Sequence, residues 1–487
     1  MPFKDLREYL STLEKLNMLV RVKKKITDPH EIFTIVWELN DRGGDPAVIF
    51  ENVMDYEIPV VSNIFGSEPK RWGLAINLPM DLSVRELRNH YIKILDDKSM
   101  WKKPVIVEKS SAPCKEVILK GDDINLYKFP ILQWHPLDGG AFITLGLSIT
   151  KDPEFGRNVG IYRMKVLDKD KTTLLCSPHQ HIGIMLDKAR KAGKKSVECA
   201  VAIGTDPALL VAGWTKLRIR EDEFEFAAAL RGGQPVELVK CETVDLEVPA
   251  TAEIVLEGEI STEEIVPEGT FGEWMGYHEE QAEAPVFKIK CITHRKDPLY
   301  VTTIVSHPRA DGEAFFRSVS QNAHFYRQVR DARVPGFVDA WLPLSGHGFM
   351  GIVSIKKIYP GWGRQVIYQL FGIPFVAATM NVVIVVDDDI DPSNLEQVIW
   401  ALSTRVDPKR DVVIIDPLAM YGLNPAASKR IKIPGSTGEI TICSRMGIDA
   451  TLKTREDLYE RPTPIPVRPQ PEMLKKVREQ WSEYGFK

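Results

Sequence analysis

The stretch AEIVLEGEISTEEIVPEGTFGEWMGY, residues 252–277, decides the fold of the middle of the chain. Apolar side chains recur in its first part at every second position, at Ala252, Ile254, Leu256 and Ile260, with glutamates at most positions between them. Because successive side chains of a strand point to opposite faces, this period predicts a strand with one buried and one mostly solvated face, as in an antiparallel sheet or barrel. Residues 158–167 and 287–291 also have strand character. We therefore predict a β-rich middle domain over residues 111–298.

The flanking segments are typical of α/β units. Residues 1–110 combine an amphipathic N-terminal helix, with Phe3, Leu6, Leu10 and Leu13 at helical spacing, with short apolar runs. Residues 299–460 contain the apolar run 382–386, then Ser393 and Glu396 at capping-box spacing before a helical pattern, then a second apolar run at 411–415. This order predicts a right-handed parallel βαβ unit. The prolines of residues 461–471 predict an extended arm before a final helix, so 461–487 forms a C-terminal arm and helix.

Length and composition agree with this division and exclude several classes of protein. The chain has 487 residues, and at roughly 150 residues per domain this corresponds to about three domains. The formal net charge is −4, so there is no basic excess to bind nucleic acid. No apolar run approaches the length that crosses a bilayer, and no signal-peptide pattern opens the chain. The six cysteines form no C-x-x-C pair, which favours a reducing cytoplasm over a disulfide framework.

One motif with the letters of a nucleotide-binding loop does not predict that function. Gly346, Gly348 and Gly351 spell G-x-G-x-x-G. The motif binds a pyrophosphate only where it leads from a strand into a helix. Here the residues that follow, 352–358, are rich in β-branched side chains and strand-like. We interpret the glycines as a tight hairpin or a chance match, and not as evidence for NAD.

Several candidate catalytic or metal-binding residues could instead have ordinary structural roles. His179 and His181, in SPHQHI, would share one face of a strand and could bind a metal, although structural roles are commoner. Glu268 and Glu273 lie in PEGTFGE, which we expect to be a glycine-punctuated turn. Two carboxylates held close in a partly apolar pocket raise the pKa of one of them, which makes it a proton donor near neutral pH. The alternative is a pair of surface glutamates.

Arg163, in NVGIYR, is a candidate for binding an anion. A buried arginine can hold a carboxylate or phosphate through two parallel hydrogen bonds, and a salt bridge on a sheet is the alternative. Asn158 lies five residues earlier, so in a regular strand the two side chains would face opposite ways. Gly160 offers a bulge that could bring both to one site.

These signals occur together in the order of a known family. The segments NVGIYRMKVLDKD (158–170), SPHQHI (177–182), residues 222–261 and VPEGTFGEWMGY (266–277) closely resemble the UbiD-type decarboxylases, and VVIVVDDDID, VIWALSTRVDP and SRMGIDAT are similar to the C-terminal domain of that family. The resemblance implies an N-terminal α/β unit, a split β-barrel like that of flavin reductases, and a C-terminal α/β domain with the dimer contacts. It also implies reversible, non-oxidative decarboxylation of an aromatic or α,β-unsaturated acid with prenylated FMN, which a flavin prenyltransferase supplies.

The resemblance further assigns residues by position. It implies that Asn158, His181 and Glu223 bind a divalent ion, usually Mn²⁺, which joins the cofactor phosphate to the protein. Backbone groups of Ala212, Gly213 and Thr215 fall where the family binds K⁺. The cofactor would contact Asn158, Ile161, Tyr162, Arg163, Gln180, His181, Glu223 and Lys216. Arg163, Glu268 and Glu273 match the catalytic Arg-Glu-Glu trio, in which Arg163 orients the substrate carboxylate and Glu273 delivers the proton that replaces CO₂.

Two positions depart from the family pattern. Asn381 stands where many members have a lysine that reaches the cofactor phosphate, and Arg445 replaces a lysine in S-K-M-G. Lys216 is our candidate to offset the missing charge. We expect a benzoic-type, phenolic or heteroaryl acid as substrate. An FMN-dependent oxidoreductase on a split barrel, or a subunit of a multi-subunit aryl carboxylase, are the alternatives.

Overall fold

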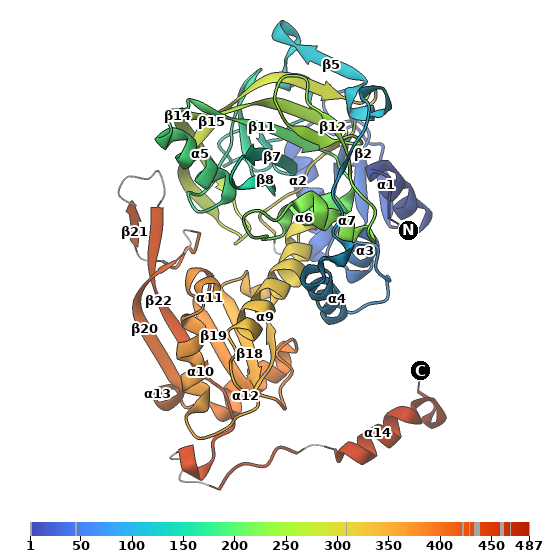
Figure 1. Ribbon diagram of the computed structural model, residues 1–487. Coiled ribbons are helices and arrows are strands. Elements are labelled where there is room, and N and C mark those ends of the chain that lie inside the picture. Colours follow the sequence, from blue (N-terminus) through green and yellow to red (C-terminus); the bar gives the residue numbers. More distant parts are fainter. Residues whose placement is uncertain are drawn as a thin grey trace.

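The computed structural model describes residues 2–43, 46–307, 309–420, 423–427, 429–432, 439–457, 462–467 and 469–486. The N-terminal and middle sheets form one body, and a C-terminal sheet forms a second body beside it (Figure 1). The chain passes between them through a long helical segment made of α8 (Asp311–Phe315), a π-helical stretch (Phe316–Gln321) and α9 (Asn322–Asp331). The predicted class, α/β with a β-rich middle, is confirmed.

The N-terminal part is a small sheet covered by helices. Its strands lie in the order β1 (Leu19–Val22), β2 (Ala47–Phe50), β3 (Val60–Ser62) and β16 (Tyr300–Val301). Its helices are α1 (Leu6–Lys15), α2 (Pro29–Asp41), α3 (Pro69–Ala75) and α4 (Val84–Asp96). The predicted amphipathic helix is α1: Asp5 caps it by accepting the Glu8 N–H at 3.0 Å, and Leu6, Leu10 and Leu13 are buried. The last strand of this sheet comes from far along the chain, so residues 300–301 pair with the N-terminal part.

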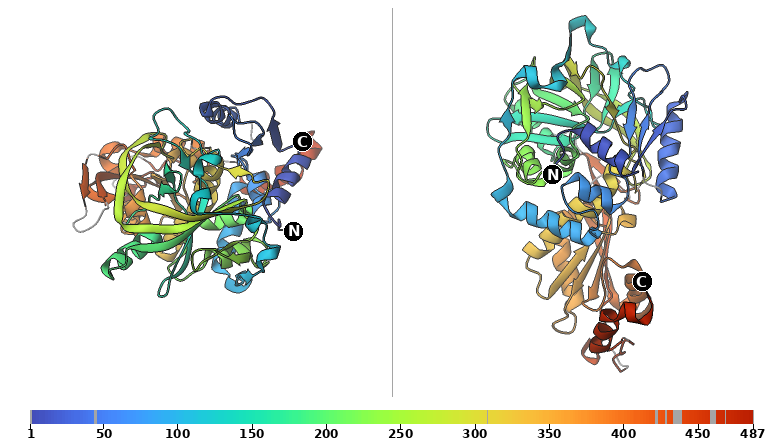
Figure 2. Two further views of the ribbon diagram at one scale, coloured as in Figure 1. Left: turned by 90° about the horizontal axis from the view of Figure 1, so that it is seen from above. Right: turned by 90° about the vertical axis from the view of Figure 1, so that its right-hand side faces the viewer.

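The middle part is a curled sheet of nine strands, all paired antiparallel (Figure 2). Eight strands follow the order β6 (Phe142–Ile143), β9 (Met164–Asp168), β10 (Lys171–Thr173), β15 (His278–His294), β14 (Ile254–Gly272), β11 (Ser196–Ile203), β7 (Gly146–Asp152) and β8 (Gly156–Ile161), and β5 (Val117–Lys120) pairs with β15. A small second sheet accompanies it, with the order β13 (Glu247–Pro249), β12 (Glu237–Lys240) and β4 (Val105–Ile106). The helices of this part are α5 (His181–Lys191), α6 (Pro207–Trp214) and α7 (Glu223–Leu230).

The prediction of a solvated glutamate face at the start of β14 is wrong. The strand begins at Ile254, and Glu253 and Glu257 are fully buried. Glu253 pairs with Arg7 at 2.8 Å, and Glu257 pairs with Lys115 at 2.8 Å. Because the sheet curls and other segments cover both faces of this strand, its acids are compensated by cations from distant parts of the chain. The alternation of apolar and polar residues along the sequence does not reveal such distant partners.

The buried pair of Lys115 and Glu257 gives a prediction about stability. We expect Lys115→Met to lower the free energy of unfolding by about 3–5 kcal/mol, because it leaves a buried carboxylate without its cation. The matched control is Lys120→Met, since Lys120 is exposed and lies 3.4 Å from Glu242, and its loss should change stability by less than about 1 kcal/mol. Denaturant unfolding monitored by circular dichroism measures both. Equal midpoints for the two variants would contradict the expectation.

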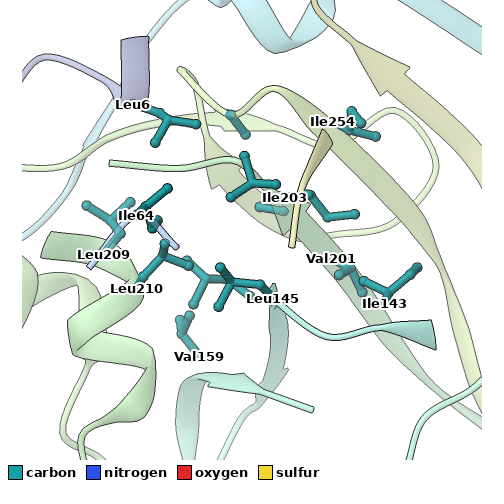
Figure 3. Close-up of a cluster of buried hydrophobic side chains, with 14 of the residues drawn as sticks. Leu6, Ile64, Ile143, Leu145, Val159, Val201, Ile203, Leu209, Leu210 and Ile254 are labelled. Atoms are coloured by element: carbon teal, nitrogen blue, oxygen red, sulfur yellow. The ribbon is translucent and has the colours of Figure 1, made fainter. Parts of the chain in front are cut away.

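A shared apolar core joins the N-terminal part to the middle sheet. Figure 3 shows side chains of α1, α6, the strands β6, β8, β11 and β14 and the segments after β3 and β6 packing together. The labelled residues are Leu6, Ile64, Ile143, Leu145, Val159, Val201, Ile203, Leu209, Leu210 and Ile254. Val159 of β8 belongs to this core. Because side chains alternate along a strand, the packing of Val159 places its neighbour Asn158 on the opposite face. The core thereby fixes one residue of the site described below.

The C-terminal sheet differs from the predicted βαβ unit. Its order is β17 (Phe337–Trp341), β18 (Met350–Ile355), β19 (Val382–Asp387), β22 (Glu439–Asp449) and β20 (Val412–Met420), with β21 (Lys429–Lys432) beside β22. The helices are α10 (Trp362–Phe371), α11 (Pro374–Thr379), α12 (Leu395–Arg405) and α13 (Pro408–Asp411). The later strand β22 inserts between β19 and β20, parallel to the first and antiparallel to the second. The parallel unit is instead β18–α10–α11–β19.

Two local predictions in this part have opposite outcomes. The capping box of Ser393 and Glu396 is wrong: Asn394 caps α12 by accepting the Gln397 N–H at 3.2 Å, and Ser393 instead donates to Asp391 at 2.7 Å. Gly346 and Gly348 lie in the hairpin connection between the antiparallel strands β17 and β18, and Gly351 lies in β18, so the motif leads into a strand and not into a helix. The interpretation against NAD therefore agrees with the fold.

The C-terminal arm projects from the second body (Figure 1). Residues 462–467 have no regular structure, and Ile465 and Val467 are almost fully exposed. Arg461 and Arg468, part of the predicted arm, lie outside the described residues. The final helix α14 spans Pro471–Glu479, shorter than expected. In the described part of the chain, no helix is both long enough and apolar enough to cross a membrane.

Candidate active site

Arg163 is the centre of a buried cluster of carboxylates. It follows β8, where the strand breaks at Tyr162 and Arg163 before β9 begins. The register of β7 with β8 is regular through Gly160, so the predicted bulge is absent and the break reorients Arg163 instead. Its Nε donates to Glu268 Oε2 at 2.8 Å, and its Nη1 donates to Glu273 Oε1. The structure therefore brings all three residues of the predicted trio together.

Glu268 and Glu273 reach this cluster because the end of β14 is irregular. The segment PEGTFGE is not the turn that the sequence predicts. Its residues 267–272 form the end of the long strand β14, whose register shifts on both sides of Gly269, and Glu273 follows the strand directly. Gly269 has φ +89°, and a side chain there would meet Gly139 Cα at 3.0 Å, so only glycine fits. Glu268 also accepts the Thr173 hydroxyl at 2.6 Å. The shifts turn both acids toward Arg163.

Burial controls the protonation of Glu273. Desolvation raises the pKa of this carboxyl, and the charges of Glu313 and Glu268 raise it further, while Arg163 and the Trp274 N–H oppose the shift. Burial alone would lower the pKa of Arg163, but the charges of Glu273, Glu268 and Glu279 together outweigh it and raise that pKa, so the guanidinium stays charged. An acid with a raised pKa beside a permanent cation can hold and deliver a proton near neutral pH.

Asn158, His181 and Glu223 form a second cluster on the adjoining strand and helix ends. His181 Nδ1 lies 3.1 Å from Asn158 Oδ1, and Glu223 accepts the Val159 N–H at 2.9 Å. His181 does not lie in a strand, as the H-x-H interpretation assumed, but is the first residue of α5. Burial lowers the pKa of His181, so the imidazole is neutral, and raises the pKa of Glu223 to about 8.

This cluster suits a cation. Glu223 is buried and forms no ion pair with any residue that the structure describes, and Asn158 Nδ2 has no hydrogen-bond partner among them. The described chain contains no group of three or more His, Cys, Asp or Glu side chains placed to hold a metal, but this set includes an amide. Carboxylate, amide and imidazole ligands suit a hard divalent ion such as Mn²⁺.

Lys216 lines a pocket between the end of α6 and the π-helical stretch Phe316–Gln321. The pocket is formed by Leu95, Thr215, Lys216, Phe316, Ser320, Gln321, His324 and Arg327. Desolvation, helped by the charge of Arg317, lowers the pKa of Lys216 to about 8, and in the described chain Lys216 has no ion-pair partner. Asn381 and Arg445 lie elsewhere: Asn381 Nδ2 donates to Cys443 Sγ at 3.4 Å, and Arg445 donates to the Ala377 carbonyl at 2.8 Å.

The other predicted contact residues lie around these groups. Ile161 ends β8, and Tyr162 is buried next to it. Gln180 caps the turn before α5, where its Oε1 accepts the Ser177 N–H at 2.6 Å. Ala212 and Gly213 lie in the last turn of α6, and Thr215 follows it, with its hydroxyl in contact with Tyr91.

Sequence reasoning missed Glu279, which lies on β15 opposite Phe271 and 2.9 Å from Arg163 Nη2. It also missed Arg317, whose guanidinium lies 3.7 Å from the ring centre of Trp274. No signal in the sequence identifies either residue, because each reaches the cluster only through the hairpin register or the path of the π-helical segment.

Comparisons with known proteins agree with this architecture. Family models described as the N-terminal, Rift-related and C-terminal domains of 3-octaprenyl-4-hydroxybenzoate carboxy-lyase match residues 10–90, 105–308 and 314–450. A protein of Archaeoglobus fulgidus is 37% identical, with 99% of each chain covered. The vanillic acid decarboxylase of Sedimentibacter hydroxybenzoicus has a TM-score of 0.85 at 31% identity, with 99% of each chain covered. The UbiD-class enzyme HmfF of Pelotomaculum thermopropionicum, in an evolved dimeric form in complex with prFMN, has a TM-score of 0.78 at 32% identity, with 97% and 98% covered.

Fold and matches together define the class of protein as a three-domain carboxy-lyase. The chain belongs to the UbiD family. The family expected from the sequence motifs is thereby confirmed.

Proposed function

We propose that the chain catalyses the reversible, non-oxidative decarboxylation of a benzoic-type, phenolic or heteroaryl acid with prenylated FMN. The observation that carries this proposal is the buried contact of Arg163 with both Glu268 and Glu273. Two structural relatives of about this length support it by their names, one a vanillic acid decarboxylase and the other an enzyme in complex with prFMN. A plain oxidoreductase would have no use for an arginine held between two acids.

The residues present fit the cofactor and its metal. The uncompensated carboxylate of Glu223, with Asn158 and His181, would hold the divalent ion, and Lys216 would face the phosphate in place of the lysine that Asn381 replaces. Ala212, Gly213 and Thr215 would offer backbone oxygens to K⁺, and Ile161, Tyr162 and Gln180 would contact the cofactor. Prenylated FMN, supplied by a flavin prenyltransferase, would provide the electron sink for the charge left when CO₂ departs.

The protein's own groups position the acid and move the proton. Arg163 would hold the substrate carboxylate through its N–H groups, and Glu268, which also accepts the Thr173 hydroxyl, would fix the guanidinium. Glu273, kept protonated by its buried surroundings, would donate to the carbon that loses CO₂. In the carboxylation direction it would accept that proton. Burial of the cluster excludes water that would compete as a proton source. We further propose a homodimer or a dimer-based oligomer, as expected from the family resemblance.

The decisive experiment combines cofactor loading with a substrate screen. The chain is co-expressed with a flavin prenyltransferase, and a panel of benzoic, phenolic and heteroaryl acids is tested for CO₂ release and for deuterium incorporation at the decarboxylated carbon. We expect at least one acid to release CO₂ and incorporate deuterium at the same rate. Bleaching of bound flavin by NAD(P)H, without exchange on any acid, would instead support the oxidoreductase alternative.

A further inference from the structure

The glycine loop of the C-terminal sheet reaches the segment that follows the proposed proton donor. This loop connects β17 and β18, whereas Glu273 belongs to the middle part of the chain, directly after β14. His347, between Gly346 and Gly348, has its Nδ1 2.9 Å from the Trp274 carbonyl oxygen. Because a carbonyl oxygen only accepts hydrogen bonds, Nδ1 carries the proton and His347 is the donor.

The backbone of His347 has a conformation that few residues with a side chain adopt. Its φ of 47° and ψ of 31° lie in the left-handed region, where histidine is more frequent than most residues other than glycine. Gly348 is left-handed as well, and a side chain there would come within 3.2 Å of Gln321 Oε1 and 3.4 Å of Arg317 Nη1. The loop therefore packs closely on the π-helical stretch, and this packing holds His347 in place. Such unfavourable conformations persist where the surrounding structure enforces them, and they are frequent at functional sites.

Trp274 is held through both its backbone and its ring. Its carbonyl accepts the hydrogen bond from His347, and its own N–H donates to Glu273 Oε2 at 3.2 Å. The centre of its indole ring lies 3.7 Å from the Arg317 guanidinium carbon and 5.0 Å from the centre of the Phe349 ring. The C-terminal part of the chain thus fixes the residue whose N–H contacts the proton donor.

We infer that His347 is a positioning residue that keeps the Trp274 N–H directed at the Glu273 carboxylate. This N–H stabilises one orientation of the carboxyl group, so a mobile Trp274 would let Glu273 turn away from the position from which it donates. The inference rests on the proposed function, since it takes Glu273 as the proton donor. It gives the glycine loop a role in catalysis that a nucleotide-binding motif does not predict.

Three substitutions of His347 separate the hydrogen bond from the backbone conformation. Alanine removes the donor, and glycine removes it while adopting the left-handed backbone without strain. Asparagine tolerates that backbone and keeps an N–H donor close to the position of Nδ1. For an acid that the enzyme turns over, we expect kcat to fall about three- to tenfold in His347→Ala and His347→Gly while KM stays within about twofold, in line with the loss of one hydrogen bond. His347→Asn should restore kcat to within about twofold of the wild type.

Hydrogen exchange gives a second measure, which needs no substrate. Mass spectrometry of peptides that cover residues 271–279, in the cofactor-loaded protein, should show exchange about three- to tenfold faster in His347→Ala and His347→Gly and unchanged in His347→Asn. Ser345→Ala is the matched control, because Ser345 is an exposed residue of the same loop, and it should match the wild type in kcat and in exchange. If His347→Ala does not fold, the glycine and asparagine variants still differ in the donor.

Wild-type kcat and exchange in His347→Ala and His347→Gly would overturn the inference, and so would an asparagine variant as impaired as the alanine variant. Wild-type behaviour of His347→Gly alone would also overturn it, because backbone strain would then explain the alanine result. A raised KM with unchanged kcat would make His347 a substrate contact instead. Faster exchange as expected, without CO₂ release from any acid, would keep the contact with Trp274 and remove the decarboxylase proposal. CO₂ release with unchanged kcat and exchange in every variant would do the reverse.

Discussion

Glu273→Gln should reduce kcat by about 10²–10⁴-fold while the flavin stays bound, because this is what general acid catalysis by one positioned group contributes. Glutamine preserves the volume of the side chain and a hydrogen-bonding contact with Arg163, but it has no proton to give. The variant therefore separates proton delivery from binding. Turnover is followed by CO₂ release and by deuterium incorporation, and cofactor content by the flavin absorbance of the purified protein.

Glu263→Gln is the control for this variant, since Glu263 is an exposed acid on β14, the strand that ends directly before Glu273. Its turnover should match the wild type. A Glu273→Gln protein that retains more than about a tenth of wild-type kcat would contradict the assignment of the donor. A protein that loses its flavin would instead make Glu273 a cofactor-binding residue.

The pH dependence of the wild type gives a second measure of the same group. Burial is the largest influence on Glu273 and raises its pKa above that of an ordinary glutamate, so its protonated form persists to higher pH. A proton donor is active below its pKa and inactive above it. The rate of decarboxylation should therefore be constant at pH values below the raised pKa of Glu273 and should fall as the pH rises through that pKa. A rate that increases over that range would require a base in place of an acid.

The sequence predicts the strand content of the middle domain well but not the partners of its strands. Alternation in residues 252–260 correctly indicates a strand, because it reports on one residue and its neighbours. The same alternation wrongly predicts that Glu257 is solvated, because it carries no information about Lys115, which lies 142 positions away in the sequence and pairs with this acid. The predicted parallel βαβ unit of the C-terminal part is wrong for the same reason: β22 comes after both β19 and β20 in the sequence but inserts between them in the sheet.

The candidate site, too, could be predicted only in part from the sequence. Spacing alone left Glu268, Glu273 and Arg163 as weak signals, and the family resemblance joined them into one cluster that the structure brings together. Glu279 could not be found in this way, since its contact depends on which residue of β15 faces Phe271 across the hairpin. The resemblance favours His181 over His179 as a ligand. The predicted strand is wrong for both residues, because His181 begins α5 and His179 lies in the turn before it.

His181→Ala should weaken the binding of manganese by more than about a hundredfold, because the loss of even an outer partner of a metal ligand reduces affinity by about 10–100-fold. His181 is a neutral imidazole at the start of α5, in contact with Asn158. If the metal joins the cofactor phosphate to the protein, its loss should release the flavin as well. Metal content by mass spectrometry and flavin absorbance after gel filtration measure both effects on the same sample.

His179→Ala is the matched control, because His179 is exposed and lies in the turn before α5, two residues ahead of His181. It should keep its metal and flavin, and both variants should retain the circular dichroism spectrum of the wild type, because His181 lies at a helix end and not in the apolar core. Equal retention in the two variants would contradict the ligand role of His181. Loss in His179→Ala alone would move the metal site to the other histidine of the pair, and Asn158 would then lose its place as a ligand.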